Sequence, residues 1–164
     1  MTAFDPLRIV RLLDERGVRF VLIGGVAAAA HGSPSVTQDL DVCYERSDEN
    51  LSCLAGVLRE LHATLRGAPA DVPFSLDRAT LARGDQFTFS TDAGDLDCLG
   101  TPAGTTGFAD LAAGAVSTDL DGLNVLVASI DDLIRMKRAV GRPKDRAEVE
   151  ILGALRDEIR RDNS

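Results

Sequence analysis

The sequence predicts an α/β (α+β) fold in which a mixed or antiparallel sheet is flanked by helices. Apolar runs typical of strands come in pairs joined by short turns, and amphipathic helical stretches lie before, between and after them. One pair is formed by residues 87–89 and 96–99, and the other by 115–120 and 123–127 around the tight-turn dipeptide Asp121-Gly122. Because strands and helices do not alternate regularly, repeated βαβ units are not expected.

The first third of the chain is expected to alternate between helices and strands. Asp5-Pro6 has the composition of a helix cap and first helical residue, and Gly17 ends that helix. Strands are predicted over residues 18–23 and 39–44, with a short helix over 25–31 between them. A further helix starts at 47–49 and carries apolar residues at helical spacing, namely Leu51, Leu54, Val57, Leu58 and Leu61.

The rest of the chain contains more loop. Residues 62–76 hold Gly67, Pro69 and Pro73 and are expected to be mostly loop, followed by short helices over 76–82 and, after the first hairpin, 108–113. A helix opens at Ser129 and ends near Gly141, and Pro143 starts the last one, whose expected buried stripe is Val149, Leu152, Leu155 and Ile159. We expect residues 1–164 to form a single domain whose C-terminal helical segment covers about 129–161.

Composition narrows the class of protein. The chain has 164 residues, 45% of them hydrophobic and 27% charged, which is typical of a globular domain with a real core. A net charge of −8 argues against affinity for nucleic acid or membrane over the whole surface. Within residues 135–146, however, six basic residues stand against the single acid Asp145. This segment favours, weakly, an anionic partner such as RNA.

Other sequence features suggest a cytoplasmic protein. Cys43, Cys53 and Cys98 are odd in number and form no CxxC pair, so neither a zinc site nor a disulfide framework is indicated. The N-terminal residues do not resemble a signal peptide, and no membrane span is found in the sequence. A reducing cytoplasm and no membrane partner are therefore expected.

The most informative feature is a glycine pair followed by alternating carboxylates. Gly24-Gly25 ends an apolar run, and a glycine turn leading into a helix is where backbone N–H groups hold a phosphate. Asp39 and Asp41 lie in the next predicted strand and share one face, since side chains alternate along a strand. Two adjacent carboxylates repel each other and need a cation. Together these features predict a metal-bound nucleoside triphosphate.

A third carboxylate on a neighbouring strand would complete a two-metal site. Asp97 is the candidate, because it lies in an apolar strand where a charge without a partner is costly. Asp95 shares its face and stays open as an alternative.

These motifs resemble the minimal nucleotidyltransferase fold of the DNA polymerase β superfamily. The residues that carry the resemblance are Gly24-Gly25, His31-Gly32, Thr37-x-Asp39-x-Asp41 and Gly94-x-x-Asp97. The tail, Asp132-Leu133-Ile134-Arg135-Met136-Lys137 and then Arg142-x-Lys144-Asp145-x-x-Glu148, is similar to AbiEii-like nucleotidyltransferase toxins and their uncharacterised relatives. The likeness covers roughly residues 18–155. It departs at Ser35, where many relatives carry Arg, and at Gly25, which replaces the Ser of the Gly-Ser form.

The resemblance implies roles for individual residues. Gly24, Gly25 and Thr37 would hold the triphosphate, and Asp39, Asp41 and Asp97 would bind Mg²⁺ (or Mn²⁺), with Asp97 also helping to deprotonate the acceptor hydroxyl. Lys137 would contact the phosphates or the base, and Asp145 would belong to the site or orient Lys137. The alternatives without a role in the site are helix-end charges for Lys137 and Arg138, and capping or pairing within the last helix for Asp145. His31 is expected to be a helix-end or packing residue and not a catalyst.

The expected activity is transfer of a nucleotidyl group from an NTP to an acceptor hydroxyl. Acceptors open at this stage include tRNA or another RNA, as for a toxin with an antitoxin protein partner. One alternative is a non-catalytic member of the fold that binds a nucleotide or a partner protein, which Ser35 makes credible. The other is an adenylyltransferase that modifies a small-molecule antibiotic.

Overall fold

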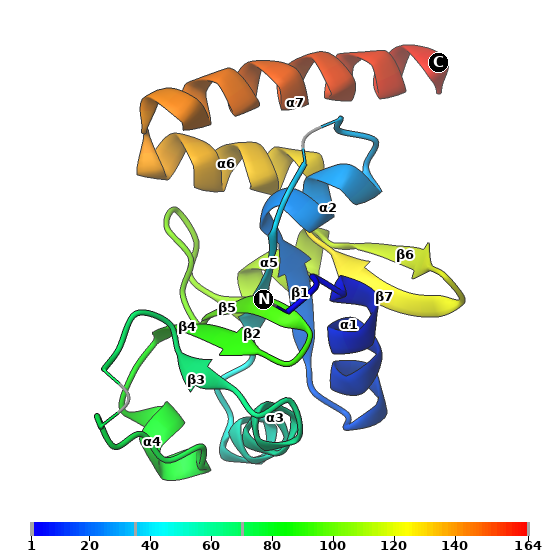
Figure 1. Ribbon diagram of the computed structural model, residues 1–164. Helices are drawn as coiled ribbons and strands as arrows, with labels where there is room; N and C mark the ends of the chain where they lie inside the picture. Colours follow the sequence, from blue (N-terminus) through cyan, green and yellow to red (C-terminus); the bar gives the residue numbers. More distant parts are fainter. Residues whose placement is uncertain (1, 35, 70, 164) are drawn as a thin grey trace.

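The described part of the chain forms one mixed, seven-stranded sheet with helices around it (Figure 1). The structure is a computed structural model that describes residues 2–34, 36–69 and 71–163. Along the sheet the strand order is β3-β4-β5-β2-β1-β7-β6. The strands are β1 (Phe20–Ile23), β2 (Asp39–Tyr44), β3 (Thr64–Leu65), β4 (Gln86–Thr91), β5 (Gly94–Leu99), β6 (Val116–Leu120) and β7 (Leu123–Val127).

The pairing makes the sheet mixed. Central β2 runs antiparallel to β1 and parallel to β5, and β1 runs parallel to β7. The predicted hairpins, β4–β5 and β6–β7, add antiparallel pairs on the two sides of this centre. The expected mixed sheet flanked by helices is therefore confirmed.

The helices begin where the sequence places capping residues. The side chains of Asp5, Ser47 and Ser129 each accept a hydrogen bond from a backbone N–H in the first turn of α1, α3 and α6. The helices are α1 (Pro6–Glu15), α2 (Gly24–Ala30), α3 (Asp48–Glu60), α4 (Arg78–Ala82), α5 (Phe108–Gly114), α6 (Ile130–Val140) and α7 (Pro143–Asp162). No helix in the described ranges is both long and apolar enough to cross a membrane.

The segment expected to be loop contains one additional strand. Thr64 and Leu65 pair with Ser90 and Phe89 of β4 and extend the sheet at its edge. The other described residues of 62–76 form no helix or strand, so the segment is mostly loop as predicted, and only this short strand was missed. A strand of two residues is too short to produce a periodic pattern. Beyond it, Phe74 packs edge-on against Phe87 and Phe89, with ring centroids about 6 Å apart, and holds the returning segment against β4.

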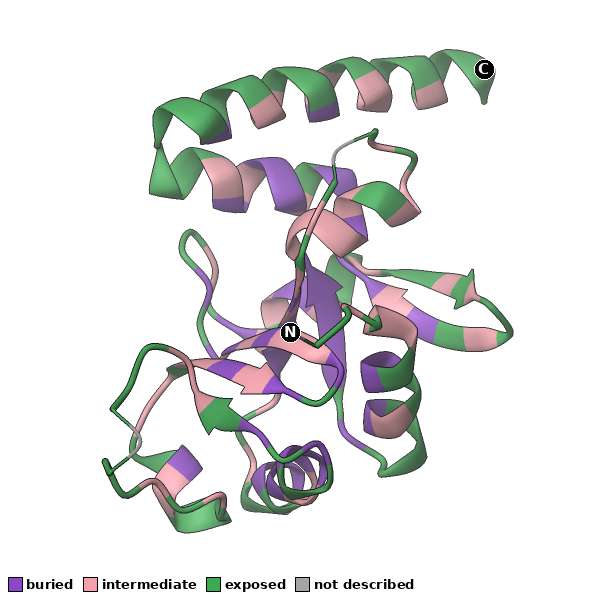
Figure 2. Ribbon diagram, viewed as in Figure 1, coloured by how far each residue is buried: buried purple, intermediate pink, exposed green. Residues whose placement is uncertain are grey.

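Figure 2 shows that β1 is buried along its length and that the outward side of α7 is exposed. Helix α7 packs mainly against α6, and the two lie antiparallel above the end of the sheet where β1 runs into α2 (Figure 1). Of the stripe expected on the last helix, only Leu152 is fully buried, and Val149, Leu155 and Ile159 are partly buried. The C-terminal helices thus form a roof over one end of the sheet.

A buried amide fixes the opposite end of the two central strands. Asn50, in the first turn of α3, accepts a hydrogen bond from Arg19 N at 2.7 Å. Its Nδ2 donates to Arg19 O at 3.0 Å and to Glu45 O at 2.7 Å. One side chain therefore joins the segment before β1, the segment after β2 and the start of α3.

We expect Asn50→Ala to lower the free energy of unfolding by about 2 kcal/mol, because several backbone groups lose their partner at a largely buried position. Urea denaturation followed by circular dichroism measures the change. Asn163→Ala, at the exposed end of α7, is the matched control and should change stability by less than ~0.5 kcal/mol. Equal losses in the two variants would contradict the anchoring role of Asn50.

Candidate functional site

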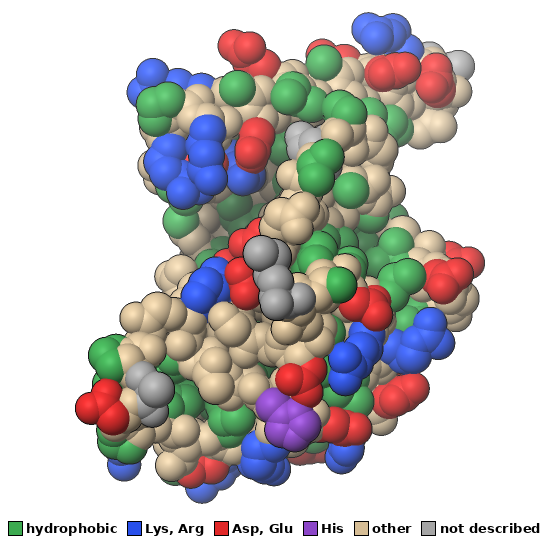
Figure 3. Space-filling view, in the orientation of Figure 1, with side chains coloured by type: hydrophobic (Ala, Val, Ile, Leu, Met, Phe, Trp, Pro, Cys, Tyr) green, Lys and Arg blue, Asp and Glu red, His purple; other side chains and the backbone are tan. Residues whose placement is uncertain are grey.

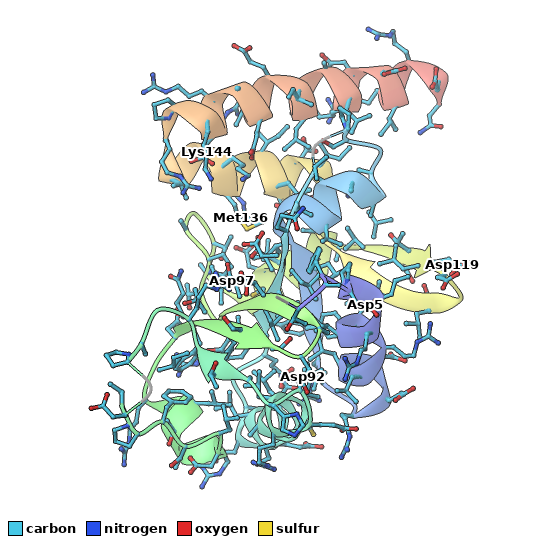
Figure 4. The ribbon with its side chains drawn as sticks, viewed as in Figure 1. Asp5, Asp92, Asp97, Asp119, Met136 and Lys144 are labelled. Atoms are coloured by element: carbon cyan, nitrogen blue, oxygen red, sulfur yellow. The ribbon has the colours of Figure 1, made fainter. Side chains whose placement is uncertain are left out.

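Three carboxylates meet at the centre of the sheet. Asp39 and Asp41 project from β2 and Asp97 from β5, and the parallel register places Asp41 directly beside Asp97. One oxygen from each of the three lies within 4.8 Å of the others. Asp95, the alternative left open by the sequence, sits opposite Asp39 and is not part of this group. Figure 4 shows Asp97 facing the space between the sheet and α6.

The electrostatics of this cluster call for a cation. Burial, together with the charges of Asp39 and Asp97, raises the pKa of Asp41 to about 8. The pKa of Asp97 is also raised, mainly by burial, although the Arg66 guanidinium opposes the shift. An all-oxygen donor set of three clustered carboxylates fits a hard divalent ion such as Mg²⁺ or Mn²⁺. The cluster is therefore a candidate metal site.

The glycine pair lies against the carboxylates because only glycine fits there. Gly24 has a φ of +68°, and a Cβ at this position would overlap Oδ2 of Asp41. A Cβ at Gly25 would come within 2.8 Å of Cβ of Thr37. The Thr37 hydroxyl donates to the backbone oxygen of Asp39 at 3.0 Å and lies 3.1 Å from its Oδ1. The turn, Thr37 and the carboxylates thus form one compact group.

This group forms the floor of a cleft of about 590 Å³, and α6 and α7 form its roof. Figure 3 shows the acidic side chains at the centre of this hollow, between the helical pair and the rest of the molecule. Met136 and Lys144 mark the roof in Figure 4, across from Asp97. The volume suits a ligand the size of a nucleotide.

Lys137 enters the cleft from α6, held by acids on α7. Its Nζ lies 2.5 Å from Oε2 of Glu148 and 3.5 Å from Oδ1 of Asp145. Its charge also lowers the pKa of Asp41, although burial and the neighbouring acids prevail at that carboxyl. The sequence pattern included Glu148 but assigned it no role. The structure makes it the nearer of the two acids that hold Lys137.

Asp145 is buried at the start of α7. It accepts hydrogen bonds from Arg142, through the backbone N at 3.1 Å, Nε at 2.7 Å and Nη2 at 3.2 Å. These bonds, and then the Lys137 charge, lower the pKa of Asp145 to about 2. Capping the helix and orienting Lys137, the two roles considered for Asp145, are therefore compatible.

Sequence reasoning missed Arg66, which reaches the cluster from the end of β3. Its Nη2 lies 2.5 Å from Oδ1 of Asp97 and its Nε lies 3.4 Å from Oδ2 of Asp95. No signal in the sequence marks this residue, since β3 has only two residues and its pairing partner lies more than twenty residues further along the chain.

The remaining expectations fall into three groups. The basic segment is partly neutralised, because Arg135 pairs with Asp110 and Asp132. In the described chain no ion pair is found for Arg138, Lys144 or Arg146.

His31 lies at the end of α2, and its Nε2 donates a hydrogen bond to Ala128 O at 2.8 Å. Ser35 lies outside the described residues.

No protein-family model matches the sequence, and no curated protein matches it. Solved structures do. The lincosamide antibiotic adenylyltransferase LnuA has a TM-score of 0.63 at 11% identity, and the match covers 92% of this chain and 95% of LnuA. The antibiotic-resistance factor ANT(2″)-Ia has a TM-score of 0.56 at 17% identity, covering 96% and 90%. TM1012 from Thermotoga maritima has a TM-score of 0.55 at 15% identity, covering 98% and 97%.

The chain has the nucleotidyltransferase fold. At these identities the matches establish the architecture and leave the acceptor open. The likeness spans the sheet and the helical roof, since it covers more than nine-tenths of this chain in each of the three comparisons. The cluster of three carboxylates on β2 and β5 is observed in this chain itself and does not depend on the comparisons.

We expect Asp145→Asn to lower the free energy of unfolding by about 1 kcal/mol at pH 7, after allowing for solvent screening around the exposed Arg142. A carboxylate with a depressed folded-state pKa contributes stability above its unfolded value of about 4 and loses it as the pH falls toward 2. The difference between variant and wild type should therefore shrink over that range, as measured by denaturation in chelator-containing buffer. Asp162→Asn is the exposed control on the same helix. A constant difference from pH 7 to pH 2 would contradict the assignment.

Proposed function

We propose that this protein is a divalent-metal-dependent nucleotidyltransferase that moves a nucleotidyl group from an NTP to a hydroxyl of an acceptor. The observation that carries the proposal is the group of three carboxylate oxygens within 4.8 Å of one another beside the Gly24-Gly25 turn. The 590 Å³ cleft above this group has room for a nucleotide, and the fold is that of nucleotidyltransferases.

The proposed chemistry is an in-line displacement at the α-phosphate. The acceptor oxygen forms a bond to the α-phosphorus, the bond from that phosphorus to the bridging oxygen breaks, and pyrophosphate leaves. Asp39, Asp41 and Asp97 would hold Mg²⁺ or Mn²⁺, which would supply positive charge against the phosphate oxygens. Asp97 would also take the proton of the acceptor hydroxyl. Thr37 keeps Asp39 in place, and the two glycines leave room for phosphate oxygens next to Asp41.

Lys137 is proposed to bind phosphate from the roof. Its ammonium lines the same cleft as the three carboxylates. Glu148 and Asp145 hold it by ion pairs, so the side chain is already ordered before a ligand arrives. Asp145 is proposed to act as a positioning residue for Lys137.

Two acceptor classes have support. ANT(2″)-Ia has been seen with adenylyl-2″-tobramycin and LnuA with lincomycin, and their likeness to this chain favours a small-molecule hydroxyl. Arg138, Lys144 and Arg146 at the α6–α7 turn favour an anionic acceptor such as tRNA or another RNA. A small-molecule acceptor is better supported than RNA, because the likeness to the antibiotic-modifying enzymes includes the roof. The basic residues are weaker support for RNA, since binding of the triphosphate would by itself account for positive charge near the cleft.

A toxin acting on RNA with an antitoxin protein partner rests only on the sequence motifs at residues 132–148. A non-catalytic member of the fold would bind NTP and metal without transferring the nucleotidyl group.

The decisive experiment incubates the protein with each α-phosphate-labelled NTP, Mg²⁺ and a panel of acceptors containing aminoglycosides, lincosamides, tRNA and total RNA. We expect label in one acceptor class and loss of transfer by at least a hundredfold in Asp39→Asn/Asp41→Asn, because the metal ligands are gone. A nonhydrolysable NTP with Mg²⁺ should raise the melting temperature of the wild type only.

The possible results separate the alternatives. Transfer to RNA alone would favour the toxin, and a nucleotide-dependent thermal shift without transfer to any acceptor would favour the non-catalytic binder. An unchanged thermal shift in the double variant would show that these carboxylates are not the metal site.

We expect Lys137→Ala to weaken nucleotide binding or transfer at least tenfold, about 1.4 kcal/mol, because it removes a charge that faces the cleft. Arg138→Ala, which removes an exposed charge from the neighbouring position, is the matched control and should change binding less than threefold. Calorimetric titration of nucleotide at two salt concentrations measures both. Equal, salt-sensitive losses would show that the segment acts as a diffuse positive field, against a specific role for Lys137.

A further inference from the structure

The side chain of Arg66 reaches the carboxylate cluster from the end of β3. Nη2 lies 2.5 Å from Oδ1 of Asp97 and also donates to Phe89 O at 3.0 Å. The backbone N of Arg66 donates to Thr88 O at 2.9 Å, which continues the β3–β4 pairing by one residue. The guanidinium is therefore held in place by the backbone as well as by the acids.

Two cations, Lys137 and Arg66, lie near the cluster, and each has its own acidic partners. Lys137, on the roof, is held by Glu148 and Asp145. Arg66 lies at the level of the sheet. Among the described residues, it is the cation that directly contacts one of the three clustered carboxylates, Asp97. The charges of Asp97, Asp95 and Asp39 all stabilise its protonated form. Arg66 thus neutralises, without any metal, part of the charge that a metal would neutralise.

We propose that Arg66 competes with the divalent ion for Asp97. The inference rests on the proposed function, since it requires the three carboxylates to be the metal site. A hydrogen bond from Nη2 occupies a lone-pair direction of Oδ1, and the positive charge of Arg66 beside the site repels the incoming cation. The three carboxylates alone therefore bind the ion weakly, and the oxygens of the triphosphate are needed to hold it.

The surroundings of Arg66 allow it to yield. Its side chain is 33% exposed, and β3 is a two-residue edge strand. Breaking the Asp97 contact leaves the pairing of β4 with β5 intact, since this pairing runs the length of both strands without Arg66. The guanidinium can consequently give way to a bound ion without disturbing the strand that carries Asp97.

A purely structural role for Arg66 predicts the opposite effect of its removal on metal affinity. If the guanidinium only fixed the orientation of Asp97 for the metal, its removal would weaken metal binding. If it competes, its removal tightens metal binding, which a loss of structure cannot imitate.

The test measures Mn²⁺ binding in the absence of nucleotide by the electron paramagnetic resonance signal of free Mn²⁺. Arg66→Gln and Arg66→Met remove the charge, and Met keeps an apolar stem if Gln perturbs folding. Both should bind Mn²⁺ about tenfold more tightly than wild type. Arg46→Gln is the matched control, because Arg46 pairs with Asp85 beyond the opposite end of β2 and has similar exposure. It should stay within twofold of wild type.

Further measurements locate the effect. The tightening should disappear in Arg66→Gln/Asp41→Asn, since the ion would then have lost its ligand. A nonhydrolysable NTP should improve Mn²⁺ affinity more in wild type than in Arg66→Gln. Mn²⁺ binding by Arg66→Gln that equals wild type or is weaker overturns the inference, and so does an equal gain in Arg46→Gln. These results leave the proposed function standing if wild type binds Mn²⁺ through Asp41. Absence of Mn²⁺ binding in every variant, with and without NTP, overturns both.

Discussion

The repulsion among Asp39, Asp41 and Asp97 is the constraint around which this structure is organised. These carboxylates lie on adjacent strands at the centre of the sheet, where burial raises the pKa of both Asp41 and Asp97. The fold nevertheless keeps them together, because β2 pairs with β5 from Asp39 to Cys43 and with β1 from Asp41 to Tyr44. It cannot slip by one residue without turning every side chain to the other face. Backbone pairing thus holds the three carboxylates close together in spite of their mutual repulsion, as a binding site for a cation requires.

The rest of the charge near the cleft is arranged in response to this cluster. Arg66 contacts Asp97 at the level of the sheet, and the charge of Lys137 acts on Asp41 from the roof. Each of these cations has acids of its own: Asp95 for Arg66, and Glu148 with Asp145 for Lys137. Asp145 is in turn held by Arg142. Chains of alternating charge of this kind order the side chains before a ligand arrives, so that less entropy is lost when it binds.

Local signals account for the parts of the structure that the sequence predicts well. Asp39 and Asp41 share a face because of strand alternation, Gly24 is needed for a positive φ against Asp41, and Ser47 and Ser129 cap helices within their own first turns. Arg66 and the strand before it were missed because their positions depend on pairing with β4, over twenty residues away. Glu148 went unassigned because its partner lies on another helix. Sequence patterns show what a segment prefers, whereas these contacts arise only when segments meet.

Under the proposed function, acceptor choice would depend on the roof more than on the floor of the cleft. The floor is fixed by strand pairing, and its carboxylates and glycines would suit any NTP. Across from it, Val140 and Ile151 are exposed on α6 and α7 although they line the cleft, and Lys144 lies at the start of α7. Helix α7 is attached mainly through α6, with Leu152 as its one fully buried apolar residue in the described chain. Substitutions on its inner face can therefore change what the cleft accepts without disturbing the sheet that carries the carboxylates, which is why likeness in fold leaves the acceptor open.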